Sequence, residues 1–171
     1  SDSICVRYDA SIAPLDQTKI AQYRKIKAHF TTEAELMARL KHRAIPTVHQ
    51  LFSQNNTHYL VTDLVDGSDL LNVSLWDPPR LTPIVIRQLL NDALSTLSAV
   101  HDSGIVHRDL SPDNFIIDHD NHLHLIDFGN AADRAAQDDL VVSTKAGYAP
   151  PEHYEEGPHT AIVSDIYALA A

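Results

Sequence analysis

Three side chains that could bind a cation stand at short spacings in the second half of the chain. Asp109 is followed five positions later by Asn114, and Asp127 lies 18 positions after Asp109. Carboxylate and amide oxygens are hard ligands of the kind that Mg²⁺ prefers. A carboxylate can also accept or orient the proton of a substrate hydroxyl group. A set of acids gathered in loops needs a cation to offset its charge, so the pattern indicates a cation-binding site.

Regular elements predicted on both sides of these residues would hold them in place. Apolar runs at 115–117 and 123–126 flank a polar turn at 118–121, which predicts a hairpin between Asn114 and Asp127. Upstream, Thr82 as N-cap and Pro83 as first helical residue open a helix that Gly104 ends. Its predicted apolar stripe is Ile86, Leu90, Ala93, Leu94, Leu97 and Val100. Residues 129–147 show no regular period and predict a long, functional loop.

A further acid falls on the predicted core face of an earlier helix. Residues 19–40 have helical periodicity, and Thr32 with Glu35 has capping-box spacing. Glu33 lies on the same stripe as Phe30 and Met37, where a carboxylate is costly without a cationic or hydrogen-bonding partner. Apolar runs at 4–6, 44–48 and 58–65 predict strands around this helix.

The composition narrows the class of protein. The 171 residues carry 13 Lys and Arg against 23 Asp and Glu, a formal charge of −10, which argues against a nucleic-acid partner. A hydrophobic fraction of 44% and a charged fraction of 21% predict a globular protein. Neither a run of about 20 apolar residues nor a signal peptide is visible. The single cysteine, Cys5, fits a reducing compartment, so we expect a cytoplasmic protein.

Three motifs occur in a fixed order along the chain. They are His-Arg-Asp-Leu-Ser-Pro-Asp-Asn at 107–114, Asp-Phe-Gly at 127–129 and Gly-Tyr-Ala-Pro-Pro-Glu at 147–152. With these motifs the chain resembles the protein kinase family, most closely the bacterial serine/threonine kinases that are similar to eukaryotic ones. The resemblance implies an α+β, two-lobed fold that is truncated at both ends. Residues 1–66 would form a partial small lobe and residues 67–171 a partial large lobe.

The resemblance also implies roles for individual residues. Asp109 would orient the acceptor hydroxyl, while Asn114 and Asp127 would hold Mg²⁺ for ATP. Glu33 would pair with a strand cation, for which the aligned residue is Arg7. The remaining implied positions are the backbone groups of Asp63 and Val65 at adenine, Ile116 as the adenine floor, and Asp165 as the anchor of the catalytic-loop backbone.

The chain departs from the family pattern at several positions. Arg7 replaces the usual lysine, and no glycine-rich loop precedes it. Ser111 stands where serine/threonine kinases have a lysine, and Lys145 stands where they have a threonine. We therefore hypothesise an exchange in which Lys145 supplies the missing ammonium group and Ser111 supplies the hydroxyl that orients Asp109.

The expected function is ATP-dependent phosphorylation of serine or threonine in a protein substrate. A pseudokinase that binds nucleotide or protein is favoured by Arg7, Ser111 and the missing glycine-rich loop, and a small-molecule phosphotransferase would share Asp109, Asn114 and Asp127. A tyrosine kinase fits the Leu-Ser-Pro of the first motif less well. Ser143 and Thr144 are possible phosphorylation sites, with Arg108 as a phosphate receptor. His119, His122 and His124 could bind metal, but their alternation with leucines is typical of the polar face of a strand.

Overall fold

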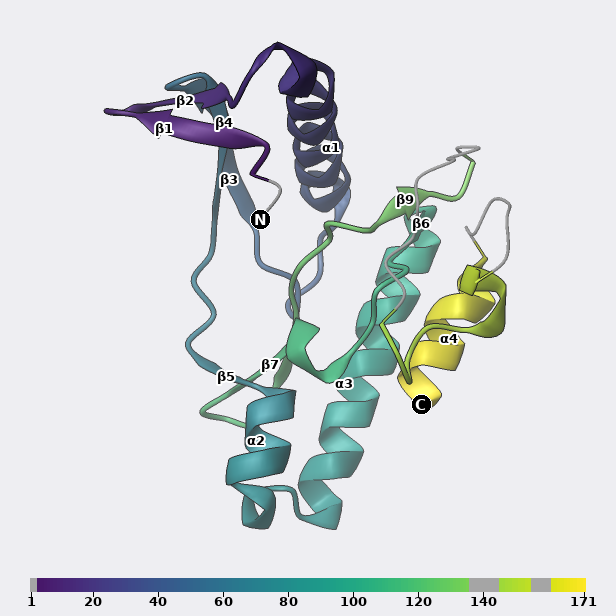
Figure 1. The fold of residues 1–171 in the computed structure, drawn as a ribbon. Coiled ribbons are helices and arrows are strands. Elements are labelled where there is room, and N and C mark those ends of the chain that lie inside the picture. Colours follow the sequence, from purple (N-terminus) through teal and green to yellow (C-terminus); the bar gives the residue numbers. More distant parts are fainter. Residues whose placement is uncertain (1–2, 136–144, 155–160) are drawn as a thin grey trace.

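A computed structural model describes residues 3–135, 145–154 and 161–171. The chain divides in space into an upper part with one long helix and two hairpins, and a lower part with three helices (Figure 1). The upper elements are β1 (Cys5–Tyr8), β2 (Ser11–Pro14), α1 (Ile20–Arg39), β3 (Val48–Gln54) and β4 (Thr57–Thr62). β1 pairs with β2, and β3 with β4, in antiparallel register.

The lower part combines helices with short strands. Its elements are β5 (Gly67–Asp69), α2 (Leu70–Trp76), α3 (Pro83–Asp102), β6 (Ile105–Val106), β7 (Phe115–Asp118), β8 (Leu123–Leu125), β9 (Ala132–Asp133) and α4 (Ile162–Ala170). The strands form a sheet in the order β5-β7-β8 and a separate β6-β9 pair. Short 3-10 turns cover Gln17–Lys19, Pro78–Arg80, Pro112–Asn114 and Pro151–Tyr154. The division at residues 66 and 67 stays a prediction.

Both long helices lie where the sequence predicts them. The Thr82 hydroxyl accepts a hydrogen bond from Val85 N at 3.3 Å, and Pro83 takes the first helical position of α3. Gly104, just beyond the C-terminus of α3, has a φ of 75°, a conformation that glycine adopts without strain. The capping box predicted at Thr32 is wrong, because Thr32 lies inside α1 and its hydroxyl donates to Ala28 O.

Other boundaries and elements differ from the expectation. The strand predicted at 44–48 starts only at Val48, because the preceding residues turn from the end of α1 into β3. The sequence patterns also miss β2, β5, β6, β9 and α2, which are all short. Two to four residues are too few to show a period of their own, and the seven-residue α2 carries apolar side chains around most of its circumference.

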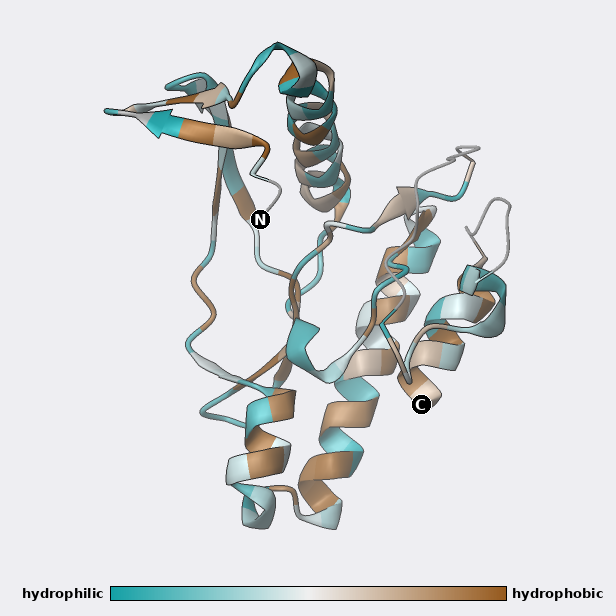
Figure 2. Ribbon diagram, viewed as in Figure 1, coloured by the Kyte–Doolittle hydropathy of each residue, from teal (hydrophilic) through white to brown (hydrophobic). Residues whose placement is uncertain are grey.

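The core follows the inner face of α3 and the β7–β8 hairpin. Leu97, Val100, Ile117, Leu125 and Phe128 are at most 1% exposed. Figure 2 shows hydrophobic colour along much of both α2 and α3, and some of the apolar residues of α3 are exposed. The predicted stripe on α3 is therefore partly wrong. Ile86, Leu90 and Leu94 are exposed, and the buried face is formed by Leu89, Asp92, Ala93, Thr96, Leu97 and Val100.

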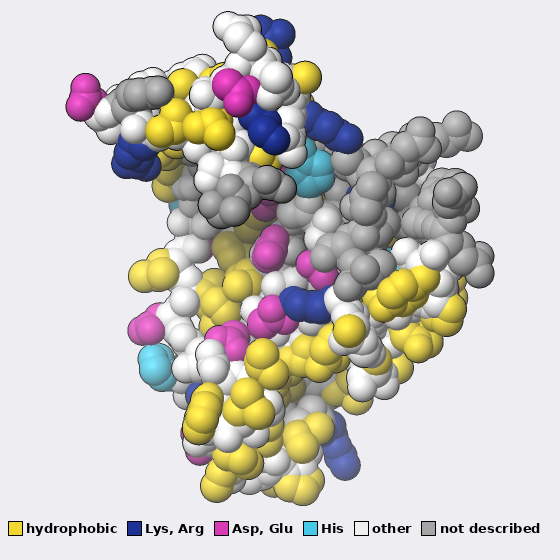
Figure 3. Space-filling view, in the orientation of Figure 1, with side chains coloured by type: hydrophobic (Ala, Val, Ile, Leu, Met, Phe, Trp, Pro, Cys, Tyr) yellow, Lys and Arg dark blue, Asp and Glu magenta, His cyan; other side chains and the backbone are white. Residues whose placement is uncertain are grey.

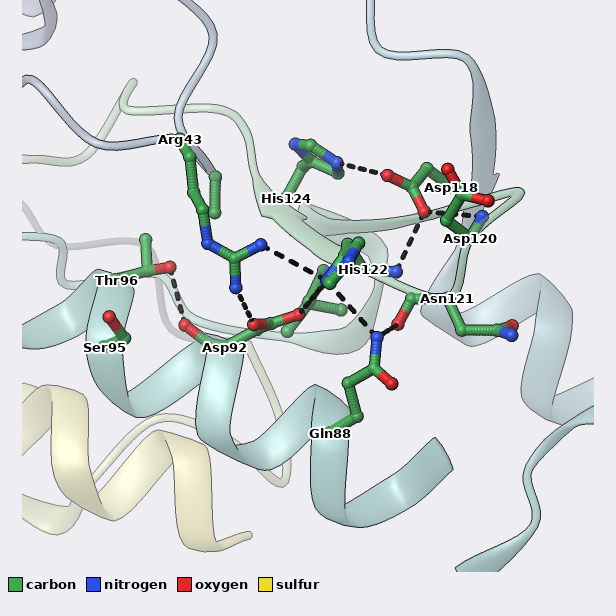
Figure 4. Close-up of polar contacts among 12 residues, drawn as sticks. Arg43, Gln88, Asp92, Ser95, Thr96, Asp118, Asp120, Asn121, His122 and His124 are labelled. Atoms are coloured by element: carbon green, nitrogen blue, oxygen red, sulfur yellow. Dashed lines mark hydrogen bonds and ion pairs between the residues drawn. The ribbon is translucent and has the colours of Figure 1, made fainter. Parts of the chain in front are cut away.

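A polar network joins the loop after α1 to α3 and the β7–β8 hairpin (Figure 4). Asp92 of α3, with a side chain only 6% exposed, forms an ion pair with Arg43 of that loop. The same carboxylate lies 3.1 Å from His122 Nδ1 and accepts a hydrogen bond from Leu123 N at 3.2 Å. A backbone bond from Leu125 N to Ala44 O, at 2.8 Å, joins the same two regions. The loop after α1 is thereby fixed on the lower part of the molecule.

Candidate active site

The catalytic-loop motif, residues 107–114, is held from behind by one carboxylate. Asp165 of α4 is fully buried and accepts hydrogen bonds from His107 N at 2.9 Å and Arg108 N at 2.8 Å. His101 Nε2 lies 2.7 Å from the same carboxylate. Arg108 has a φ of 65°, an uncommon conformation for a residue with a side chain, which these bonds help to hold. This is the anchoring contact that the sequence predicted for Asp165.

Asp109 and Asn114 are joined within this loop. Asn114 Nδ2 donates to the Asp109 carbonyl oxygen at 2.7 Å, so the amide oxygen of Asn114 points away from that contact. The Asp109 carboxylate accepts a hydrogen bond from Asn130 Nδ2 at 3.0 Å. One oxygen of the carboxylate is thus oriented, and the side chain remains only partly buried.

Asp127 is brought to this loop by the hairpin. Ile126 N donates to Asn114 O at 2.9 Å, which fixes the start of the Asp-Phe-Gly motif beside the end of the catalytic loop. Asp127 is exposed, has a φ of 61°, and accepts a hydrogen bond from Gly129 N at 3.0 Å. Phe128 is fully buried, and its ring lies edge-on to the ring of His107 with centroids 4.9 Å apart. A side-chain bond from Asn114 to Asp109 and a backbone bond from Ile126, the neighbour of Asp127, to Asn114 thus join these three residues in one bonded unit.

Glu33 enters the same region from α1. A carbon placed on Gly129 would lie 3.0 Å from Asp127 Oδ1 and 3.8 Å from Glu33 Oε2, so both carboxylates lie beside this glycine. Burial raises the pKa of Glu33, and the negative charge of Asp127 raises it further. Among the described residues no cation lies within ion-pair distance of Glu33.

The structure does not bring Arg7 to Glu33, and the ion pair expected between them in the nucleotide-bound arrangement stays a prediction. Arg7 is exposed on β1, opposite Ile12 of β2. β2, rather than β1, faces the helix, because Ile12 O accepts a hydrogen bond from Tyr23 of α1 and Ile12 N donates to Asn55 O. β1 is the outer strand of its hairpin, and among the described residues Arg7 forms no ion pair with Glu33.

The residues predicted to face adenine lie on the connection between the two parts of the molecule. Asp63 N donates to Thr47 O at 3.1 Å, so that donor is occupied and only the Asp63 carbonyl can face a base. Hydrogen bonds from Thr47, followed by one from His49, lower the pKa of Asp63 to about 2. Val65 N–H has no backbone partner among the described residues, and Ile116 lies half-buried in β7. Their contact with a nucleotide stays a prediction.

Ser111 and Lys145 meet at the front of the catalytic loop. Lys145 Nζ donates to Ser111 Oγ at 2.8 Å and to Asp113 Oδ1 and Oδ2 at 2.7 and 2.6 Å. The exchange hypothesis requires Lys145 Nζ within hydrogen-bond distance of the catalytic loop, and this contact is present. The hypothesis also requires the Ser111 hydroxyl to orient Asp109. That contact is absent, because the hydroxyl donates to Asp113 Oδ1 at 2.7 Å and not to Asp109.

Two residues of this site were missed by the sequence analysis. Asp113 binds Lys145 and Ser111, and Asn130 orients Asp109. Asp113 lies inside the first motif and Asn130 directly follows Asp-Phe-Gly, so their closeness to the motifs could have marked both residues as candidates for the site. Ser143 and Thr144, the predicted phosphorylation sites, lie outside the described residues.

Comparison with known proteins decides the family. Residues 11–171 match the model of the protein kinase domain. The chain belongs to the protein kinase family. It is 30% identical to the serine/threonine-protein kinase PknL of Mycobacterium tuberculosis over 169 residues, which are 96% of this chain and 42% of that protein. It is 33% identical to human serine/threonine-protein kinase MRCK alpha over 129 residues, 73% of this chain and 7% of that protein.

A solved kinase structure agrees with the fold. The chain titled PpkA-294 apo form superposes with a TM-score of 0.83 and 31% identity, covering 99% of this chain and 60% of that one. The resemblance to bacterial serine/threonine kinases and the α+β, two-lobed fold class are thereby confirmed. This kinase chain spans less than half the length of the curated relatives it matches. None of its described helices combines the length and the hydropathy needed to cross a bilayer.

Proposed function

We propose that the protein containing this chain transfers the γ-phosphoryl group of ATP to serine or threonine hydroxyls of a protein substrate. The observation that carries this proposal is the bonded unit of Asp109, Asn114 and Asp127. Phosphoryl transfer demands alignment and charge neutralisation more than covalent catalysis, and this unit offers one oriented carboxylate beside two oxygen ligands. The serine/threonine kinases among its relatives support the choice of acceptor.

The residues present fit Mg²⁺. Asn114 uses its amide nitrogen on Asp109 and keeps its oxygen for a cation, and Asp127 is exposed toward the cleft. The described residues contain no group of three or more His, Cys, Asp or Glu arranged to hold a metal. Two oxygen ligands, with water and phosphate oxygens completing the shell, are the usual protein share for Mg²⁺. Bound there, the metal would neutralise phosphate charge.

The protein residues then act on the acceptor. The acceptor oxygen forms a bond to the γ-phosphorus while the bond from that phosphorus to the bridging oxygen breaks. The electron pair of the broken bond leaves on ADP, and the hydroxyl proton passes to the Asp109 carboxylate. Asn130 holds this carboxylate in one orientation through its 3.0 Å hydrogen bond.

The test is an Asp109→Asn substitution in the full-length protein. We expect transfer of labelled γ-phosphate to protein to fall by about 10²- to 10⁴-fold, the usual contribution of a positioned acid or base, while MgATP affinity changes little. Asp102→Asn, at an exposed position of α3, is the matched control. Phosphoamino acid analysis of the product should give phosphoserine or phosphothreonine. Equal turnover by the two variants would contradict the role of Asp109.

A pseudokinase is the second candidate, because Glu33 has no cationic partner among the described residues. Titration calorimetry with MgATP, which measures binding, separates the two functions when it is combined with the phosphate-transfer assay. Binding without measurable transfer to any protein would support the pseudokinase, whereas transfer confined to small-molecule acceptors would indicate a small-molecule phosphotransferase. A cytoplasmic location stays a prediction.

A further inference from the structure

Carboxylates outnumber cations around the candidate transfer site. Asp109, Asp113, Asp127 and Glu33 surround it, and Figure 3 shows acidic side chains gathered in the hollow between the two parts with a basic side chain beside them. Such a site would repel the γ-phosphate of a nucleotide unless cations offset the charge. Mg²⁺ can supply part of that charge, and the remainder must come from the protein.

Lys145 is the protein cation placed to supply it. Among the described residues, its ammonium group is the only one hydrogen-bonded to the catalytic loop, and Lys145 and Asp109 line the same small cavity. Arg108 also lies in this loop and lines the same cavity, but its Nε donates to the backbone oxygen of Asn130 at 2.6 Å, and at 4% exposure it is less open to a ligand than Lys145. Glu33, on the opposite wall, forms no ion pair with any cation in the part of the chain that the structure describes.

The loop holds the ammonium group at a defined point. Ser111 is buried, and its hydroxyl is fixed by the 2.7 Å bond to Asp113. Lys145 Nζ meets both groups at 2.6 to 2.8 Å, and Ser111 and Asp113 follow Asp109 by two and four residues. The side chain of Lys145 is still 37% exposed, so a phosphate arriving from the cleft could reach it.

We propose that Lys145 is a catalytic residue whose ammonium group binds the γ-phosphoryl oxygens during transfer. Asp113 and Ser111 are positioning residues that hold this group at the catalytic loop. The inference rests on the proposed kinase function and adds the source of positive charge. The charge is supplied by Lys145 from outside the catalytic loop, while Ser111, two positions after Asp109, carries only a hydroxyl.

The competing interpretation is a purely structural ion pair that fixes residues 145–154 on the loop. The two interpretations differ in how Lys145→Met compares with Asp113→Asn in the full-length protein. A structural pair loses the same contact from either side, so both substitutions would have equal effects. A catalytic ammonium group is lost only with Lys145, because Asp113→Asn leaves the charge beside the substrate.

We therefore expect Lys145→Met to lower kcat by about 100- to 1,000-fold, the effect of removing one stabilising group from a transition state. Asp113→Asn should lower kcat by less than about tenfold, and the KM for MgATP should change only a few-fold in both variants. Lys41→Met, at an exposed position outside the candidate site, is the matched control. Thermal melting of each variant checks that it is folded.

A charge relocation completes the test. The double variant Ser111→Lys with Lys145→Thr returns an ammonium group to the loop, and we expect it to recover at least tenfold of the kcat lost in Lys145→Met. Equal losses in Lys145→Met and Asp113→Asn, or wild-type kcat in Lys145→Met, would overturn the role of Lys145 while leaving the kinase function intact. Absence of transfer by the wild-type protein would instead overturn the proposed function, and this inference with it.

Discussion

Two carboxylates on opposite sides of the cleft, Asp165 and Glu33, have different surroundings. On the large-lobe side, Asp165 is completely buried and is surrounded by donors from His101, His107 and Arg108 at 2.7 to 2.9 Å. On the small-lobe side, Glu33 is half-buried, faces the charge of Asp127, and has a raised pKa. The large-lobe wall is thus organised by the chain's own hydrogen bonds. On the small-lobe wall, no cation among residues 3–135, 145–154 and 161–171 forms an ion pair with Glu33.

This difference bears on how the site would work. A loop fixed by bonds to a buried carboxylate keeps Asp109 and Asn114 in place before any ligand arrives, which lowers the reorganisation needed for reaction. A carboxylate without a partner gains stabilisation only when a cation approaches it. We infer that ligand binding changes the electrostatics of the Glu33 wall more than those of the Asp165 wall.

Among the substitutions that test this comparison, we expect Asp165→Asn to change the free energy of unfolding most. The amide keeps one acceptor oxygen and replaces the other by a donor. Either Arg108 N, or His107 N together with His101 Nε2, would therefore lose its acceptor. We expect the free energy of unfolding to fall by about 2–4 kcal/mol, because each unsatisfied buried donor costs about 1–3 kcal/mol. Urea denaturation measures it, with Asp102→Asn as the exposed control. A change within error of that control would show that the buried anchor is unimportant.

An intermediate effect is expected at Asp92, the buried carboxylate of α3. Asp92→Asn keeps the side-chain shape but removes the charge that faces Arg43 and His122. Breaking hydrogen bonds to a buried charged group costs about 1.5–3 kcal/mol, and we expect a loss near the lower end because Arg43 is more than half exposed. Arg43→Met should cost less than Asp92→Asn, since it leaves His122 and Leu123 N on the carboxylate. The reverse order in urea denaturation would contradict this network.

We expect the smallest change in stability at Glu33, and this change tests directly whether its carboxylate has a cationic partner. Its raised pKa means that the folded state favours the protonated carboxyl, so ionisation costs stability. That cost is absent below the unfolded-state pKa and grows as the pH rises through the raised folded-state pKa. Glu33→Gln should therefore stabilise the protein at pH 8, by at most about 0.5 kcal/mol after solvent screening, and have no effect at acid pH.

Urea denaturation at several pH values measures this change, and Glu35→Gln, an exposed position on the same helix, is the control. Destabilisation by Glu33→Gln at pH 8, of the size expected for a broken ion pair, would mean that a cation reaches Glu33 after all. In that case Arg7→Met should produce a similar loss. If Arg7 stays on the outer strand, Arg7→Met should be neutral.

The sequence determined the parts of this protein that depend on local pattern. The motif at 107–114 and the Asp-Phe-Gly at 127–129 identified the site, and periodicity with caps located α3 closely. The hairpin between Asn114 and Asp127 followed from two apolar runs around a polar turn. These features depend on residues close in the chain, where steric and hydrogen-bonding preferences act directly.

Only the tertiary structure decided which distant charges meet. The phase of α3 shows this, because Asp92 faces inward, with Arg43 and His122 as partners, while Ile86 and Leu90 face outward. Arg7 and Glu33 matched by family position, yet the strand order places Arg7 on the outer strand. Lys145 and Asp113 lie 32 positions apart and meet at 2.6 Å. The sequence indicates whether a charged side chain tends to be exposed, but it does not indicate which charge will be its partner. Coulomb attraction has no preferred direction and falls with separation, so the partners are decided only when packing fixes the distances.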